Sequence, residues 1–169
     1  MQKQNLGNYP YYVQRYLDMV PESDLNEAFS NQMASIKHIV ERIDETKANY
    51  SYAEGKWTLK ELLQHCIDTE RIFSFRALAF ARKEPASLPG FEEDDYAKNS
   101  FANERSWKSL VEELLAVRNA TEKLFNSFND EALHYSGLAN NNESSVISIG
   151  FLTVGHLAHH LKIVEERYL

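Results

Sequence analysis

Two histidines near the end of the chain, His156 and His160, are spaced so that a helix would present both on one side. Residues four apart are separated by about 40° around a helix axis, so two such imidazoles can converge on one cation. His159 lies toward the margin, about 100° from His160, and is expected to be a bystander or a neighbour of the ligands. Leu157 stands where a metalloprotease motif needs its glutamate, which excludes that motif. We expect His156 and His160 to face the interior of the protein, because both fall within an apolar stripe of their helix. The stripe is formed by Ile149, Leu152, Ile163 and Val164.

Two histidines alone make a weak site, so a third ligand must come from another helix. His65 is the strongest candidate, whereas Cys66 lies at the margin of its stripe and is expected to be a small core residue. We expect His38 and His134 to be exposed. A buried imidazole without a partner costs roughly 1–3 kcal/mol, and a shared metal ion would remove that cost for the three inward histidines. The alternative is a set of core histidines that only pack and form hydrogen bonds. The stripe that contains His65 runs through Leu62, Thr69, Ile72, Phe73 and Phe80.

Three neutral imidazoles leave a divalent ion with open positions, which is the arrangement of a catalytic metal site. Such an ion can activate water for hydrolysis, or bind a thiol as thiolate and present it to an electrophile. Zinc, nickel and iron are the favoured ions, and copper and others also suit three imidazoles. No residue is clearly placed to act as a general base beside the metal. We expect Asp68 to lie beside a metal ligand or at the surface, and Gln32 to be a polar core residue.

Two further side chains, Arg76 and Trp57, could contribute to a site. Arg76 falls within the His65 stripe nearly three turns on, where it could meet an anionic substrate, but an ion pair with an acid of the LPGFEEDDY segment is the preferred interpretation. Trp57 is expected to pack against the end of the bundle rather than to form a substrate platform. Glu70 points away from the stripe.

Four amphipathic segments must position these residues. The first is capped by Ser23 or Asp24 and is expected to run to about Lys47; the second begins near residue 59 after a Thr58/Glu61 capping box and ends before Pro85. The third follows a Ser106 cap to about residue 127, and the fourth runs from about residue 146, after Ser144 or Ser145, to the C-terminus. We therefore predict an all-α, four-helix bundle that forms a single domain over residues 1–169. The connections at 83–105 and 129–145 are expected to be loops, the first of them long enough to help cover a site.

Composition narrows the function classes. The chain has 169 residues, with 18 basic and 25 acidic side chains and a formal net charge of −7, which argues against a nucleic-acid partner. Cys66 is the single cysteine, so no internal disulfide can form. The N-terminus lacks the apolar stretch of a secretory signal, and no run approaches the roughly 20 apolar residues that span a bilayer. We expect a cytoplasmic protein that acts on a small molecule without a membrane partner.

The sequence resembles the DinB-like superfamily of small four-helix metalloproteins, and in particular its bacterial branch of thiol-dependent transferases, which were formerly called metal-dependent hydrolases. The resemblance rests on the segments YYVQRYLDMVP, YAEGKWTLKELLQHCIDTERIFSFRALAFAR, LPGFEEDDY and GHLAHHLKIVEERYL. It implies a left-handed bundle, a homodimer, and a divalent metal held by His65, His156 and His160.

The activity that the resemblance implies is metal-dependent transfer of a low-molecular-weight thiol to an electrophilic substrate. Because the superfamily contains several activities, metal-dependent hydrolysis and non-catalytic binding of a metal or small ligand remain alternatives.

Overall fold

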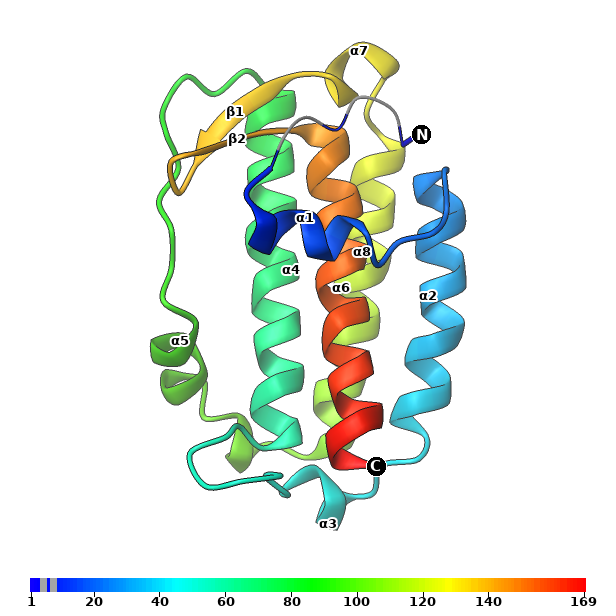
Figure 1. Ribbon diagram of the computed structural model, residues 1–169, viewed down its shortest axis with the longest axis vertical. Helices are drawn as coiled ribbons and strands as arrows, with labels where there is room; N and C mark the ends of the chain where they lie inside the picture. The colour runs from blue at the N-terminus through cyan, green and yellow to red at the C-terminus, as the bar shows by residue number, and fades with distance from the viewer. Residues whose placement is uncertain (4–5, 7–8) are drawn as a thin grey trace.

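A computed structural model describes residues 1–3, 6 and 9–169, except for the side chain of Tyr12. Its four long helices are α2 (Leu25–Val40), α4 (Leu59–Ala81), α6 (Trp107–Asn126) and α8 (Val146–Ile163), and a π-helical turn, Val164–Tyr168, continues α8. They form a four-helix bundle, as the sequence predicts (Figure 1). Helices α2 and α8 run in one direction and α4 and α6 in the other (Figure 1).

The helix starts follow from their capping residues. Thr58 accepts a hydrogen bond from the backbone N–H of Glu61 at 3.1 Å, and the Glu61 carboxylate accepts one from the backbone N–H of Thr58 at 2.8 Å. These reciprocal bonds satisfy two backbone donors that the first turn of α4 cannot pair. Asp24 caps α2, and Ser106 and Ser145 cap α6 and α8. The predicted starts of all four helices are therefore confirmed.

The expected first helix is too long, because α2 ends at Val40 rather than near Lys47. The chain turns after Val40 and forms a separate short helix, α3 (Glu45–Ala48). Asp44 starts this helix by accepting a hydrogen bond from the backbone N–H of Lys47 at 2.7 Å. A good capping residue inside an apolar repeat thus begins a new helix instead of extending the old one.

The connection between α4 and α6 is long because these two helices run in the same direction. The chain leaves the end of α4 and must travel the length of the bundle before α6 can begin (Figure 1). On the way it forms α5 (Glu93–Asn99), which contacts α4, and a short 3-10 turn, Ala102–Glu104. The segment expected to be a loop therefore carries a helix that covers one side of α4.

The polar segment before α8 is more ordered than the sequence suggests. It contains a short helix, α7 (Asp130–Leu133), and an antiparallel hairpin of β1 (Ser136–Ala139) and β2 (Asn142–Ser145). Asn140 and Asn141 both have positive φ, the backbone conformation that two-residue hairpin turns require and that asparagine tolerates. The expectation of a loop without strands is wrong here. The backbone of Leu88 also bonds to this hairpin, accepting from Asn140 N–H and donating to the Leu138 carbonyl.

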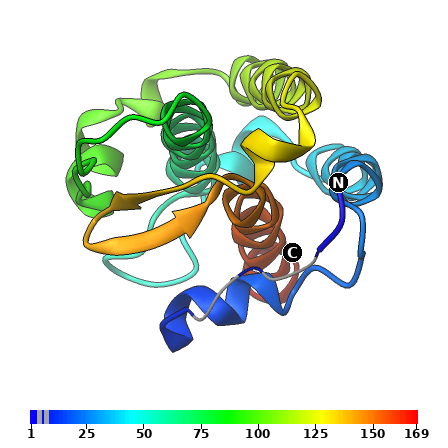
Figure 2. The same cartoon turned by 90° about the horizontal axis from the view of Figure 1, so that it is seen from above.

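A short N-terminal helix, α1 (Tyr11–Leu17), lies across α8 (Figure 2). The close approach depends on Gly155, because a Cβ atom at that position would lie 2.0 Å from the backbone oxygen of Tyr16. The segment Val146–Tyr168 is long and apolar enough to cross a membrane, but 72% of its most apolar window is buried inside the protein, as in the core helix of a bundle.

The buried apolar side chains form two clusters. One includes Phe29, Phe80 and Phe125, and the other includes Ile36, Ile67 and Leu114. On each long helix, buried polar side chains lie in sequence between members of the two clusters: Gln32, Thr69, Glu70, Arg118, Thr121 and His156. The bundle is therefore apolar toward both ends and polar in its middle.

Candidate metal centre

Three histidine side chains from two helices meet inside the bundle. His65 comes from α4, and His156 and His160 come from α8. The Nε2 atom of His156 lies 3.1 Å from that of His65 and 3.1 Å from that of His160. One nitrogen from each ring lies within 4.8 Å of the others. The structure thus brings together the three residues that helical spacing selects.

This donor set fits a divalent metal ion. Two imidazole nitrogens bound to one tetrahedral ion at about 2.0–2.1 Å are separated by about 3.3–3.4 Å, close to the observed 3.1 Å. A neutral imidazole nitrogen carries either a proton or a lone pair, so His156 Nε2 cannot donate to one neighbour while accepting from the other. A cation that receives the lone pairs of all three nitrogens satisfies them at once.

Burial keeps the three imidazoles neutral. His65 and His156 are buried and His160 is partly buried. Burial lowers the pKa of His65 to about 4, although the charge of Asp94 opposes the change. Burial, together with the neighbouring His65 and His159, lowers the pKa of His160 to about 3, and the pKa of His156 is also well below its usual value for the same reason. Near pH 7 a metal ion would therefore not compete with protons for these nitrogens.

Aromatic rings enclose the histidine cluster. The Trp57 ring lies 4.8 Å from the His65 ring between centroids, so this indole forms a wall of the centre as well as closing the end of the bundle. The rings of Phe73 and Tyr16 lie 6.0 and 5.6 Å from that of His156. These rings limit the access of water to the imidazoles from several sides.

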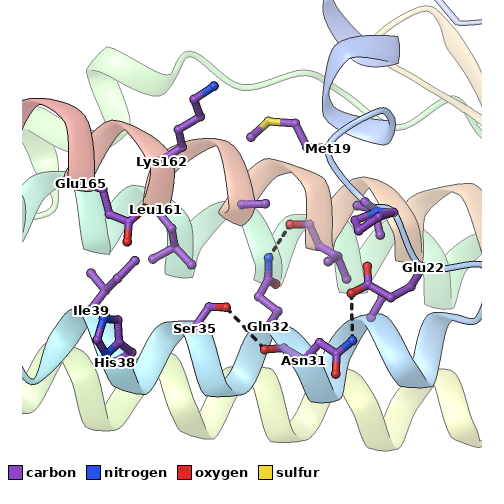
Figure 3. Close-up of a pocket in the computed structure, with 15 residues that line it drawn as sticks. Met19, Glu22, Asn31, Gln32, Ser35, His38, Ile39, Leu161, Lys162 and Glu165 are labelled. Atoms are coloured by element: carbon purple, nitrogen blue, oxygen red, sulfur yellow. Dashed lines mark hydrogen bonds between the residues drawn. The ribbon is translucent and has the colours of Figure 1, made fainter.

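A cavity of about 320 Å³ lies elsewhere, between α2 and α8, and is bordered by the exposed side chain of His38 (Figure 3). None of the three clustered histidines lines it. A different cavity, of about 300 Å³, reaches His160 and is referred to below as the His160 cavity. Its other lining residues come from the α3–α4 connection, α4, α5 and the end of the chain: Tyr52, Gly55, Lys56, Trp57, Leu62, Glu93, Asp94, Ile163 and Tyr168. The long connection after α4 therefore contributes to a space beside the histidines.

The remaining histidines and the cysteine lie outside the cluster. His38 and His134 are exposed, as expected. His159 is half-buried, with its ring 5.2 Å from that of Tyr16 and 5.1 Å from that of His160, so it is a neighbour of the cluster. Cys66 is buried in an apolar cluster, and burial raises the pKa of its thiol far above the usual value. It acts as a core residue, as predicted.

The structure corrects one prediction about polar side chains and adds to another. Glu70 points away from the histidines, as predicted, and is buried against α6, where it forms an ion pair with Arg118. Gln32 is a polar core residue of the same group, as expected, because its side chain accepts a hydrogen bond from Arg118 at 2.6 Å. Arg76 does not pair with an acid of the following loop; its guanidinium donates to the backbone carbonyl of Pro89 at 2.9 Å. Asp68 is half-buried and accepts a hydrogen bond from Gln64.

Sequence reasoning missed Arg118, although a signal for it exists. Arg118 is fully buried and occupies the apolar stripe of α6, between Leu114 and Phe125. A charged residue inside such a stripe requires a buried partner of opposite charge. It also missed the side-chain hydroxyl of Thr69 and Nδ1 of His160, two buried polar atoms that have no hydrogen-bond partner within the described part of the chain.

Comparison with known proteins gives one family and one structural relative. The family model described as the DinB superfamily matches residues 14–164, which is most of the chain. The structural relative is YfiT from Bacillus subtilis, described as a probable metal-dependent hydrolase with an unusual four-helix bundle topology. The two structures align with a TM-score of 0.71 and 15% sequence identity, covering 95% of this chain and 87% of YfiT. No curated protein matches the sequence.

Proposed function

The chain belongs to the DinB superfamily, and from this premise we propose that it is a metal-dependent enzyme that transfers a low-molecular-weight thiol to a small electrophilic substrate. One observation carries the proposal: three neutral imidazoles from α4 and α8 converge beside a cavity that is large enough for a small molecule. A structural metal site is usually closed by four protein ligands, whereas three histidines leave room for a reactant.

His65, His156 and His160 would hold the ion through their Nε2 atoms. A bound divalent ion would supply Lewis-acid activation of a nucleophile at neutral pH. Trp57, Phe73 and Tyr16 exclude water from the imidazoles, which strengthens electrostatic interactions in the centre.

The His160 cavity is where the electrophile would bind. Tyr52 and Tyr168 form its aromatic floor, with ring centroids 5.0 Å apart, and the Tyr168 hydroxyl donates to the Trp57 carbonyl at 2.7 Å. In the transfer, the thiol loses its proton to solvent, a sulfur–carbon bond forms, and the leaving group departs with the electron pair of the broken bond. An ion held by the three histidines would favour the thiolate form of the thiol, so this reaction would need no protein base.

Hydrolysis is the second candidate, and Asp94 favours it. Its carboxylate lies in the His160 cavity and its charge acts on His65, so it is positioned near the centre from α5. A carboxylate beside an activated water can accept its proton. YfiT, which shares the fold, is itself described as a probable metal-dependent hydrolase.

Metal analysis tests the site. The purified protein is stripped with a chelator, reconstituted separately with zinc, nickel and ferrous iron, desalted and measured by elemental analysis. We expect about one ion per chain in the wild type and almost none after His65→Ala, His156→Ala and His160→Ala are combined. The matched control is His134→Ala, which removes an exposed histidine from the surface. Equal metal content in the wild type and the triple variant would refute the centre.

Turnover separates the two activities. Metal-loaded protein is incubated with cysteine or glutathione as the thiol and 1-chloro-2,4-dinitrobenzene as the electrophile, and separately with p-nitrophenyl acetate as an ester. Thiol transfer predicts conjugate formation that depends on the metal and is insensitive to Asp94→Asn. Hydrolysis predicts ester cleavage that Asp94→Asn reduces. Rates equal to those of the metal-free protein in both assays would contradict an enzymatic function.

A further inference from the structure

A third cavity is lined by Tyr16 and Phe73, the two residues whose aromatic rings contact His156. This cavity of about 150 Å³, here called the Arg76 chamber, is formed where α4, α8, α1 and the hairpin meet. Its walls are largely apolar, and Arg76 brings the only charged side chain among the residues that line it. The residues are Tyr9, Val13, Tyr16, Phe73, Arg76, Phe80, Ala139, Asn140, Asn142, Ser144, Ile149 and Leu152.

The Arg76 guanidinium has no carboxylate partner in the described structure. The arginine ion pairs among the described residues involve Arg71, Arg105 and Arg118. Arg76 makes one hydrogen bond, from Nη2 to the Pro89 carbonyl, and lies 5.9 Å from the centre of the Phe73 ring. A guanidinium has five N–H donors, so most of its donor capacity stays available.

The Arg76 charge is partly withdrawn from water, and no acid compensates for the lost hydration. Arg76 is half-buried, and burial lowers the pKa of its guanidinium, with no acid offsetting the change. The position of the Arg76 guanidinium is nevertheless held by the surrounding chain. Leu88 forms hydrogen bonds to the hairpin through both its backbone N–H and its carbonyl, which fixes the loop that carries Pro89. A held, under-paired guanidinium in an apolar space is a preformed site for a planar anion.

The size of the chamber limits the ligand. A cavity of about 150 Å³ lined by apolar side chains is large enough for one benzene ring. Aromatic side chains of Tyr9, Tyr16, Phe73 and Phe80 surround the space, which suits a flat or short apolar body. Arg76 is the one cationic side chain among the residues that line the chamber, which suits a ligand with a single negative charge better than a ligand with two.

We propose that the Arg76 chamber binds a small monocarboxylate, with the carboxylate on the guanidinium and a single ring or short chain between Tyr16 and Phe73. The chamber belongs to the substrate site, an assignment that rests on the proposed function. Both of those rings also contact His156, so the bound monocarboxylate would lie beside the histidine cluster while the His160 cavity receives the electrophile.

Benzoate is the probe, because it combines one ring with one carboxylate. It is titrated into the metal-free protein while the backbone amide signals of the residues that line the chamber, which every variant keeps, are followed by NMR. We expect a saturable shift in the wild type, affinity reduced about tenfold or more in Arg76→Gln, and a smaller loss in Arg76→Lys, which keeps the charge but not the planar fork. The matched control is Arg82→Gln, which removes an exposed arginine at the end of the same helix and leaves binding unchanged.

Two further ligands identify what is recognised. Benzamide has nearly the same shape without the charge, and equal affinity for benzamide would show an apolar cavity only and overturn the proposal. Tighter binding of inorganic phosphate than of benzoate would overturn the carboxylate assignment, as would the absence of any benzoate binding. Metal content is measured in parallel. If Arg76→Gln keeps its metal but loses benzoate binding, the loss concerns the chamber alone. If the proposed metal centre is wrong, the histidine variants will show unchanged metal content.

Discussion

The buried ion pair between α4 and α6 offers the sharpest test of how the bundle is held together. Arg118 donates from Nε and Nη2 to the two carboxylate oxygens of Glu70, each at 2.9 Å, and from Nη1 to Gln32 at 2.6 Å. The exposed fractions are 0% for the Arg118 side chain and 3% for that of Glu70. Every strong interaction of this guanidinium is therefore made inside the protein.

Glu70→Leu leaves a buried guanidinium without its counter-charge. Breaking one partner of such a pair costs about 3–5 kcal/mol in the free energy of unfolding. For a chain of this size that loss corresponds to a melting temperature about 6–20 °C lower. The double variant Glu70→Leu/Arg118→Met removes both charges, and only the side-chain oxygen of Gln32 then loses its partner, which costs about 1–3 kcal/mol. The double variant should therefore be more stable than Glu70→Leu alone.

Urea unfolding followed by circular dichroism measures these differences in the metal-free protein. Arg71→Leu is the control, because Arg71 pairs with Glu113 at the exposed surface of the same two helices and should cost less than about 1 kcal/mol. A Glu70→Leu variant within 1 kcal/mol of the wild type, or a double variant less stable than the single one, would refute the reasoning.

Three further predictions concern the metal centre and its surroundings. His160→Ala should lose most of the bound metal while His159→Ala keeps it, as measured by elemental analysis after reconstitution. The pKa of His65 is lowered from 6.5 to about 4, so the unfolded chain binds that proton more tightly than the folded chain. His65 alone should thus remove ~3 kcal/mol of unfolding free energy from the metal-free protein as the pH falls from 6.5 to 4, and His65→Leu should weaken this dependence in urea titrations. His156 and His160, whose pKa values are also lowered, add to the loss. Gly155→Ala should lower the melting temperature by several degrees, because its Cβ would clash with the Tyr16 carbonyl; an unchanged melting temperature would show that α1 moves away freely.

Helical spacing was sufficient to predict the elements that carry the centre. Thr58 and Glu61 mark the start of α4 by their own hydrogen bonds, so that boundary is a local property of the sequence. His65, His156 and His160 were selected because each lies on an apolar stripe, and the packing of α4 against α8 brings those stripes together. The hairpin was missed because its turn depends on positive φ at two asparagines, which a polar, asparagine-rich stretch shares with ordinary loops.

The burial of Glu70 was not predicted because of the position of α4 in the bundle. A helical wheel assumes one buried face, but α4 packs against both α6 and α8 and therefore has two. His65 lies on the face of α4 toward α8. Glu70, five residues later, lies on the face toward α6, where it forms an ion pair with Arg118. Glu70 does not look buried from α4 alone, whereas Arg118 lies within the apolar stripe of α6, and each supplies the charge that makes the burial of the other possible. The metal centre could be predicted one helix at a time, whereas the ion pair requires that α4 and α6 be known to run side by side.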